Sequence, residues 1–258
     1  MRSRLQAGLI RTYQLIDATG LLSTTFGEWA FRSAYTGYKR FIEAGHLWPL
    51  RPLVSPGTSV IDVGANLGFF TLEFARWVRD GGKVIAIEPE AVNYGRLCRA
   101  VAGAGMTHLV DTVQAAAAET SGEVGLIVNR RHPGDHRIGD SGVRVPAVTI
   151  DDLLAARGWP RVSLVKIDVQ GSESRVLAGA DETLRSLHPA LFIEVCDEAL
   201  QMSRSSAERL LGGLYDRGYS AYRTAREGIV GPMTDSQALG ETRKEHYVDL
   251  LFLRPGAA

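Results

Sequence analysis

The sequence has little of what marks several classes of protein. Its two cysteines, Cys98 and Cys196, form no close pair and join no histidine cluster of zinc-ligand spacing, so no zinc site is indicated. The 29 basic and 29 acidic residues cancel, so no net charge favours nucleic acid or an anionic membrane surface. Because Arg11, Gln14 and Asp17 interrupt the apolar N-terminal segment, we expect neither a signal peptide nor a membrane span there. We therefore expect a cytoplasmic protein that binds no nucleic acid.

What is present suits one large α/β domain. The chain has 258 residues, of which 45% are hydrophobic and 22% charged, enough to bury a sizeable core. From residue 56 onward, segments with the pattern of strands alternate with segments of helical periodicity. This alternation predicts a doubly wound, Rossmann-like sheet of about seven mostly parallel strands. We assign residues 56–258 to this domain and residues 1–55 to an N-terminal helical segment.

The two ends of the chain are predicted to add helices and an antiparallel edge. Apolar and aromatic residues recur at helical spacing in residues 5–22 and 26–42, which predicts two helices ahead of the sheet. These helices either pack on the core or form a lid over the acceptor pocket. Residues 219–222 and 246–253 have the pattern of late strands with no clear helix between them, so we expect an antiparallel pair at the sheet edge.

The stretch SVIDVGANLGFF, residues 59–70, organises the predicted site. It has the pattern of a buried strand that runs into a glycine turn and a helix, and the next strand, KVIAIE, follows at residues 83–88. Gly64 and Gly68 allow the backbone to approach a ligand closely. Where these strands end, the sequence places three polar residues, Asp62, Asn66 and Glu88. Such an arrangement is typical of a nucleotide-cofactor site.

The glycine turn distinguishes between cofactors, whereas the acidic residue does not. In the dinucleotide fingerprint GxGxxG, the second glycine lets the pyrophosphate approach the helix, and Asn66 replaces that glycine here. Asn66 therefore argues against a pyrophosphate. A carboxylate at the end of the second strand, such as Glu88, accepts both ribose hydroxyls of NAD or of S-adenosylmethionine equally well.

Four motifs, in order and spacing, resemble one family. They are DVGANLGFFT, IEPEAVNYGRL, VQAAAAETSGEV, and VKIDVQGSE followed by VLAGA. Together they resemble the FkbM-type methyltransferases, a branch of the class I S-adenosylmethionine-dependent fold, over residues 56–195. The last motif departs from the family's pattern at Gln170, where glutamate is common, but it keeps Asp168 and Glu173.

The resemblance implies a binding mode for S-adenosylmethionine. Its methionine part would lie over Gly64 to Gly68, with the amino group held by Asp62, and its ribose would bind Glu88. The adenine would lie near three further residues, Pro89, Gln114 and Ala116. Because members of the family typically methylate hydroxyl groups, the resemblance implies an O-methyltransferase that acts on a small natural product, sugar or glycolipid. The identity of this hydroxylated acceptor and the oligomeric state are left open.

An alcohol acceptor must also lose its proton, and histidine is the commonest general base. His132 and His136 lie in the polar run HPGDHR, which we expect near the carboxyl ends of the strands. We predict that His136 is the base, oriented by Asp135 or Asp168; the alternative is a solvated surface loop. Asp168 follows a buried strand, where a carboxylate is costly without a partner, so we expect Asp168 and Glu194 to take part in catalysis.

The same carboxylates could instead bind a divalent cation. Asp168, Glu173 and Glu194 could ligate Mg²⁺, provided that the ends of their strands adjoin. The alternative for Glu194 is a salt bridge with Lys166 or an arginine. Lys166 lies within a predicted strand, and we interpret it as the partner of a carboxylate and not as a nucleophile.

Two other functions are compatible with the sequence. One is an NAD(P)-dependent oxidoreductase of Rossmann type, and the other is a non-catalytic cofactor-binding protein. Tight NAD(P) binding without binding of S-adenosylmethionine would favour the first. If neither Glu88→Ala nor His136→Ala affects any measured turnover, the second is favoured.

Overall fold

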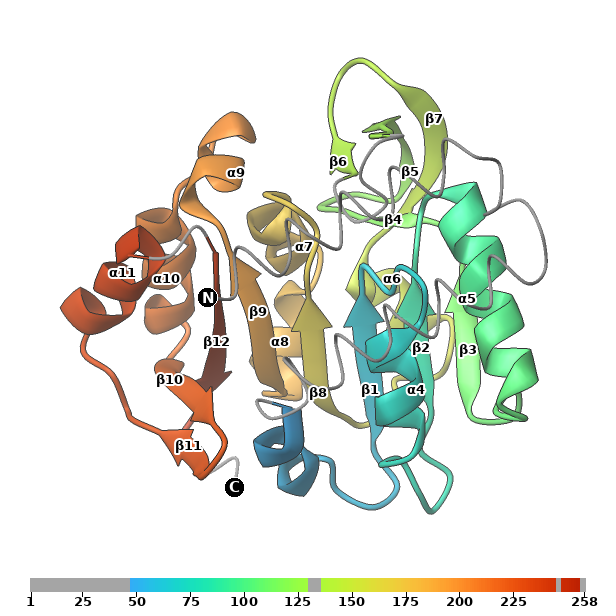
Figure 1. Cartoon of the computed structure of the whole chain (residues 1–258), viewed down its shortest axis with the longest axis horizontal. Coiled ribbons are helices and arrows are strands. Elements are labelled where there is room, and N and C mark those ends of the chain that lie inside the picture. Colours follow the sequence, from blue (N-terminus) through green and yellow to red (C-terminus); the bar gives the residue numbers. More distant parts are fainter. Residues whose placement is uncertain (1–46, 130–135, 245–246, 256–258) are drawn as a thin grey trace, which may run out of the picture.

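The computed structural model describes residues 47–129, 136–244 and 247–255, and its largest element is a sheet of eight strands (Figure 1). The strand order is β11-β10-β12-β9-β8-β1-β2-β3. The five neighbouring strands β9, β8, β1, β2 and β3 pair in parallel. The pairs of β12 with β9, β10 with β12 and β10 with β11 are antiparallel. The strands are β1 (Ser59–Val63), β2 (Val84–Ile87), β3 (Val110–Val113), β8 (Val162–Ile167), β9 (Ala190–Val195), β10 (Ser220–Ala225), β11 (Gly228–Val230) and β12 (Val248–Leu253).

The central strands form because their sequences are apolar on both faces. All five residues of β1 and all four residues of β2 are buried. A parallel strand with helices on both sides needs apolar side chains on both sides, so its sequence is a continuous apolar run and does not alternate. Along β1, Val60 belongs to one hydrophobic cluster, and Ile61 and Val63 belong to another.

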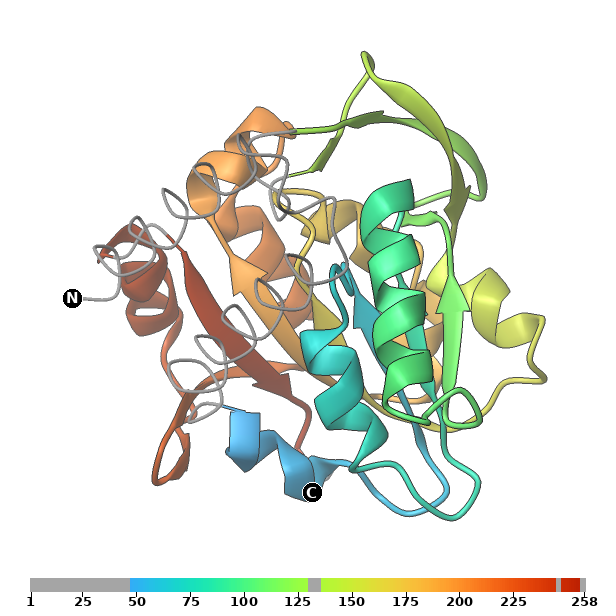
Figure 2. The ribbon, with the colours of Figure 1, turned by 45° about the vertical axis from the view of Figure 1, so that its right-hand side comes forward.

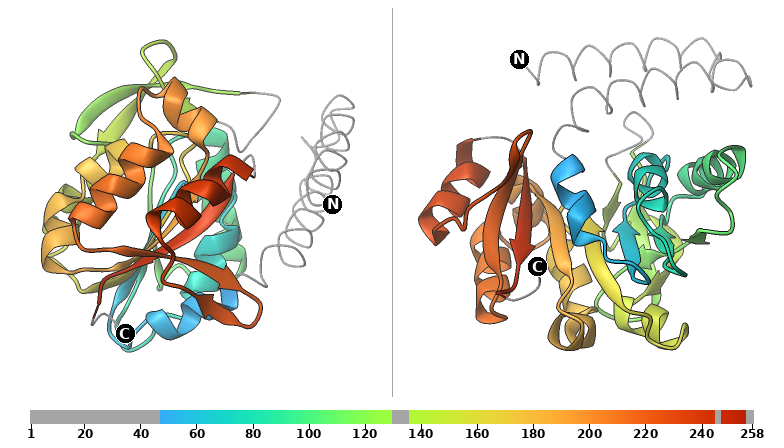
Figure 3. Two further views of the ribbon diagram at one scale, coloured as in Figure 1. Left: turned by 90° about the vertical axis from the view of Figure 1, so that its left-hand side faces the viewer. Right: turned by 90° about the horizontal axis from the view of Figure 1, so that it is seen from below.

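Helices cover both faces of the sheet (Figure 3, right). The cluster on one face contains residues of η2, α4 and α5, and the cluster on the other contains residues of α6, α7, α8, α10 and α11. The helices are η2 (Trp48–Leu53), α4 (Phe69–Ala75), α5 (Ala91–Gly103), α6 (Ile150–Ala155), α7 (Glu173–Ala178), α8 (Asp181–Ser186), α9 (Asp197–Met202), α10 (Ala207–Asp216) and α11 (Asp235–Lys244). The predicted doubly wound α/β architecture is confirmed.

A second, four-stranded sheet lies beyond the carboxyl ends of β1 and β2 (Figures 1 and 2). Its strands, in the order β4-β7-β5-β6, are β4 (Ala116–Ala117), β7 (Val143–Val148), β5 (Gly122–Ile127) and β6 (Arg137–Ile138). Strands β5 and β7 pair in antiparallel fashion. A small cluster of Ala116, Leu126 and Val145 forms the core of this sheet.

The C-terminal part differs from the prediction in one element. The late strands β10 and β12 do pair in antiparallel fashion, but α11 lies between them in the chain, so the expectation of no helix there was wrong. The helix DSQALGETRK is largely polar and buries only Ala238 and Thr242, so it lacks the apolar periodicity that reveals a helix in sequence. A further strand, β11, forms the edge of the sheet beside β10.

The N-terminal prediction concerns residues that lie mostly outside the described ranges. The helices expected at residues 5–22 and 26–42 fall there, so the division of the chain at residue 55 stays a prediction. Within the described ranges, no helix combines the length and the apolar character needed to cross a membrane.

Candidate active site

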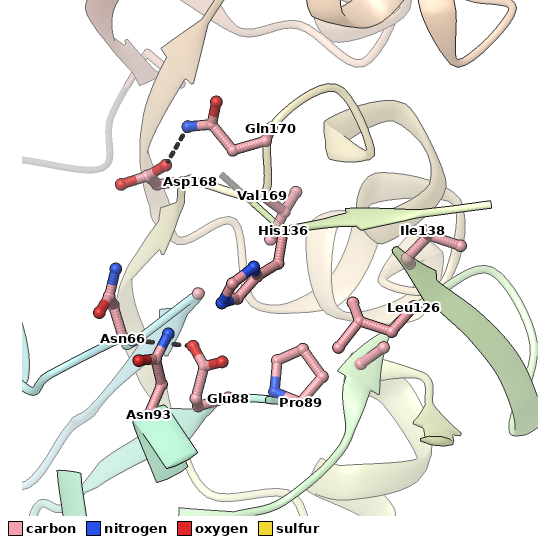
Figure 4. Close-up of a pocket in the computed structure, with 12 residues that line it drawn as sticks. Asn66, Glu88, Pro89, Asn93, Leu126, His136, Ile138, Asp168, Val169 and Gln170 are labelled. Carbon is pink, nitrogen blue, oxygen red and sulfur yellow. Dashed lines mark hydrogen bonds between the residues drawn. The ribbon is translucent and has the colours of Figure 1, made fainter. Parts of the chain in front are cut away.

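A pocket lies where the carboxyl ends of β1, β2 and β8 face the second sheet (Figure 4). Loops that follow these strands contribute polar groups to its wall, together with Asn93 on α5 and His136 ahead of β6. Strands β4, β5 and β6 contribute apolar side chains. Its lining residues are Gly64, Asn66, Glu88, Pro89, Asn93, Ala116, Leu126, His136, Ile138, Asp168, Val169 and Gln170. The structure therefore brings together seven of the residues predicted from the sequence: Gly64, Asn66, Glu88, Pro89, Ala116, His136 and Asp168.

The two glycines of the turn are required by contacts within the protein itself. Gly64 has a φ of +72°, and a Cβ built there would lie 1.9 Å from the backbone oxygen of Asp168. Gly68 has a φ of +85°, and its Cβ would lie 2.8 Å from the Leu97 side chain on α5. Gly64 thus lets β1 and β8 approach each other at the pocket, and Gly68 lets α5 pack on the turn. Gly64 lines the pocket, whereas Gly68 does not.

Glu88 is a buried carboxylate held by two backbone donors. Its side chain follows β2 and is only 4% exposed. Asn66 N donates to Oε2 and Glu90 N donates to Oε1, each at 2.9 Å. Burial raises the pKa of Glu88 to about 7, although these two hydrogen bonds lower it. An ionised carboxylate has about four lone-pair positions, so each oxygen keeps the capacity to accept one ligand hydroxyl.

A buried lysine fastens the glycine turn to the neighbouring strands. Lys166 Nζ lies 3.4 Å from Asp62 Oδ1 and 3.4 Å from Asp168 Oδ2, and it donates to the Gly64 carbonyl at 3.0 Å. Its predicted role as the partner of a carboxylate is confirmed. Asp62 is fully buried beneath the turn, where Oδ2 accepts from Thr71 Oγ1 at 2.6 Å, and it does not line the pocket. Its proposed contact with a methionine amino group stays a prediction.

Three polar side chains meet at the end of the pocket formed after β8. Gln170 Nε2 donates to Asp168 Oδ1 at 3.2 Å (Figure 4). The same nitrogen donates to Glu194 Oε1 at 2.8 Å. Asp168 and Gln170 line the pocket, while Glu194, on β9, lies behind them and does not line it. The condition on which a shared role of Asp168 and Glu194 depended is therefore met, since β8 and β9 are neighbours, with the Gln170 amide between the two carboxylates.

His136 projects into the middle of the pocket between the Glu88 end and the Asp168 end (Figure 4). Its Nδ1 accepts a hydrogen bond from Asn129 N at 3.2 Å. A ring nitrogen that accepts carries no proton, so in the neutral form of this imidazole the proton would lie on Nε2. The predicted orienting residue Asp135 and the neighbouring His132 lie outside the described residues.

The remaining carboxylate candidate does not line the pocket. Glu173, at the start of α7, is 2% exposed, and its Oε1 accepts from Gly171 N at 3.0 Å and from Val169 N at 3.4 Å. Burial raises the pKa of Glu173 to about 7. In the part of the chain that the structure describes, no three His, Cys, Asp or Glu side chains gather as metal ligands, so Asp168, Glu173 and Glu194 form no such set.

Sequence reasoning missed five lining residues: Asn93, Leu126, Ile138, Val169 and Gln170. Gln170 and Val169 directly follow Asp168, so their nearness to a strand end was the available signal. Leu126 and Ile138 come from the second sheet, and no local motif marks them. Gln114, which was predicted beside the adenine, is exposed and does not line the pocket, although Ala116 does.

Comparison with known proteins identifies similar chains. Residues 62–221 match the family model described as the methyltransferase FkbM domain. The chain is 32% identical over 161 residues to the 31-O-demethyl-FK506 methyltransferase FkbM of Streptomyces tacrolimicus. The matched region covers 49% of this chain and 61% of that protein. It is also 28% identical over 204 residues to the methyltransferase sdnD of Sordaria araneosa, and here the matched region covers 65% of this chain and 76% of that protein.

The fold is also similar to a solved structure. The crystal structure of methyltransferase FkbM from Methylobacillus flagellatus KT matches with a TM-score of 0.50 and 16% identity, over 77% of this chain and 44% of that chain. At this identity the similarity concerns the fold alone. The chain thus spans less than two thirds of the Streptomyces relative and less than half of the Methylobacillus protein.

Proposed function

We propose that this chain, which belongs to the methyltransferase FkbM domain family, transfers a methyl group from S-adenosylmethionine to a hydroxyl group of a small molecule. The observation that carries the proposal is Glu88, a buried carboxylate that faces the pocket with both oxygens fixed by backbone donors. The name of the Streptomyces relative, a methyltransferase of a 31-O-demethyl compound, supports an oxygen as the acceptor atom.

The pocket has the parts that the methyl donor requires. Glu88 would accept the two ribose hydroxyls, and the turn from Gly64 to Asn66 would face the methionine part. The apolar side chains that line the pocket beyond Glu88 would contact the adenine; they are Pro89, Ala116, Leu126 and Ile138. The bound donor would supply a methyl group on a positively charged sulfur, which leaves as the neutral thioether when the acceptor oxygen takes the methyl. The protein's contribution is then chiefly to align the reactants.

The acceptor hydroxyl must give its proton to a group of the protein. Because His136 Nδ1 already accepts a hydrogen bond, the ring is better suited to donate to the acceptor oxygen from Nε2 than to take a proton there. We therefore propose that the Asp168 carboxylate takes the proton and that His136 orients the acceptor oxygen. This exchanges the roles that the sequence suggested for these two residues.

Calorimetry tests the cofactor assignment. S-adenosylhomocysteine is expected to bind the wild-type protein, and Glu88→Ala is expected to weaken its binding by about 2 kcal/mol or more, because two charged hydrogen bonds are lost. Glu90→Ala is the matched control: it removes a neighbouring carboxylate whose Oε2 accepts from Asn93 N at the start of α5. Tight binding of NAD(P) without binding of S-adenosylhomocysteine would overturn the proposal in favour of an oxidoreductase.

Methyl transfer tests the catalytic assignment, with acceptors screened by mass spectrometry among hydroxylated small molecules. Asp168→Asn is expected to lower the rate by about 10²- to 10⁴-fold, the usual contribution of a general base. His136→Gln keeps a donor and is expected to retain more activity than His136→Ala. Equal activity of the two His136 variants, together with a fully active Asp168→Asn, would contradict the assignment. The acceptor's identity, a role in natural-product biosynthesis and the cytoplasmic location stay predictions.

A further inference from the structure

The turn that follows β1 is held by different groups on its two sides. On the N–H side, Gly64 N and Ala65 N both donate to the Ile87 carbonyl at 3.0 Å. The next N–H group, Asn66 N, donates to Glu88 Oε2 at 2.9 Å. These three hydrogen bonds attach the turn to the end of β2, where Glu88 lies. The N–H side of the turn therefore supports the Glu88 end of the pocket.

On the carbonyl side, the turn is held by a side chain of β8. Lys166 Nζ donates to the Gly64 carbonyl at 3.0 Å and to the Val63 carbonyl at 3.5 Å. Val63 is the last residue of β1, and Gly64 follows it. The lysine thus continues the hydrogen bonding of the strand into the turn, at a residue that lines the pocket.

The amino end of Lys166 is enclosed by β1, β8 and α4. Its side chain is only 4% exposed, and Nζ lies 3.4 Å from both Asp62 Oδ1 and Asp168 Oδ2. The Phe70 ring of α4 lies 4.8 Å from Nζ. Because Lys166 does not itself line the pocket, any effect on a ligand must pass through the backbone that it holds at Gly64.

We infer that Lys166 is a positioning residue that sets the affinity of the pocket for the amino-acid part of the methyl donor and not for its nucleoside part. The inference rests on the proposed function, in which the turn faces the methionine part and Glu88 binds the ribose. Glu88 is held by N–H groups, whereas the Gly64 carbonyl is held by Lys166, so the two parts of the pocket have separate supports. Loss of the lysine would release Gly64, and a shift of about 1 Å is enough to weaken a binding group.

Two ligands separate these parts of the pocket. S-adenosylhomocysteine carries the amino-acid part, and 5′-deoxy-5′-methylthioadenosine has the same adenosine and thioether without it. In calorimetry, Lys166→Met is expected to weaken S-adenosylhomocysteine binding about tenfold and to leave methylthioadenosine binding within about twofold of wild type. Lys166→Arg keeps a donor and is expected to retain more affinity for S-adenosylhomocysteine than Lys166→Met. Glu88→Ala is expected to weaken the binding of both ligands.

Lys83 supplies the matched control. Its side chain is 51% exposed, and Nζ lies 3.7 Å from Asp111 Oδ1, away from the residues that line the pocket. Lys83→Met therefore removes the same kind of group from the surface, and it is expected to leave the affinity for each ligand within about twofold of wild type. Thermal melting of every variant establishes that it is folded.

A measurement on the wild-type protein tests the inference even if the buried position accepts no substitution. ¹⁵N NMR of protein labelled in lysine follows the side-chain nitrogen of Lys166, which is assigned by replacing the other lysines, Lys39, Lys83 and Lys244, with arginine. Saturation with S-adenosylhomocysteine is expected to shift this signal, whereas saturation with methylthioadenosine is expected to leave it in place.

Three results would overturn the inference and leave the proposed function standing. They are an equal loss of affinity for the two ligands in Lys166→Met, an unchanged affinity of that variant for S-adenosylhomocysteine, and equal shifts of the Lys166 signal with the two ligands. Failure of the wild-type protein to bind S-adenosylhomocysteine is a different result, because it would overturn the proposed function and the inference with it.

Discussion

At the scale of single residues, Glu88 makes the proposed cofactor site sensitive to pH. With its pKa raised to about 7 by burial, this carboxyl is mostly protonated at pH 6 and mostly ionised at pH 8. Only the ionised form accepts hydrogen bonds from both ribose hydroxyls. The affinity for S-adenosylhomocysteine is therefore expected to fall about tenfold from pH 8 to pH 6, which calorimetry at several pH values would measure.

Glu173 provides the control for this prediction, because burial also raises its pKa to about 7 but it does not line the pocket. Glu173→Gln should keep the pH dependence of cofactor affinity, whereas Glu88→Gln should bind weakly at every pH and lose the dependence. If the pH dependence persists in Glu88→Gln and disappears in Glu173→Gln, the group that controls cofactor affinity is Glu173 and the prediction is wrong.

At the scale of elements, the turn after β1 depends on how closely β8 approaches it. Gly64→Ala is expected to lower the free energy of unfolding for two separate reasons. A left-handed φ costs about 1–2 kcal/mol for a residue with a Cβ, and the contact of 1.9 Å with the Asp168 carbonyl forces a shift that costs about 1–3 kcal/mol more. Urea unfolding would measure the loss of unfolding free energy.

Gly105 isolates the first of these effects, the cost of the left-handed backbone. Its φ of +69° nearly equals that of Gly64, but a Cβ there would meet no atom within 4 Å. Gly105→Ala should therefore lose only the conformational part, about 1–2 kcal/mol. If the two alanine variants lose the same stability, the close approach of β1 and β8 carries no energetic weight.

The elements that sequence patterns predicted are those whose information is local. β1, β2 and β8 are buried runs with a glycine turn or a carboxylate at their ends, so a window of about ten residues contains the signal. The role of Gly68 was not visible in that way, because Leu97, the residue that would meet its Cβ, comes from α5. In the same way, Leu126 and Ile138 reach the pocket only through the pairing of β5 with β6. The polar helix α11 was missed because its face carries too few apolar residues.

At the scale of the whole molecule, the site lies where the carboxyl edge of the parallel sheet meets the second sheet. The parallel sheet supplies the polar groups at its carboxyl edge, and the second sheet covers them with apolar side chains. Both Glu88 and Glu173 are buried at this edge, at 4% and 2% exposure. The fold therefore holds two carboxyls whose environment favours the protonated form, and this affects global stability.

The free energy of unfolding is consequently expected to decrease as pH rises. In both groups the pKa of the folded protein, about 7, exceeds the ordinary glutamate value of 4.5, so the folded state binds the proton more tightly. Their contribution is fully present below pH 4.5 and is lost as pH rises through 7, by roughly 3 kcal/mol for each group. Urea titrations at pH 5 and pH 8 measure the change. Glu173→Gln, which imitates the protonated carboxyl, should gain roughly 2 to 3 kcal/mol relative to wild type between these pH values, because part of the contribution is already lost at pH 5. Equal pH dependence of the two proteins would contradict the raised pKa.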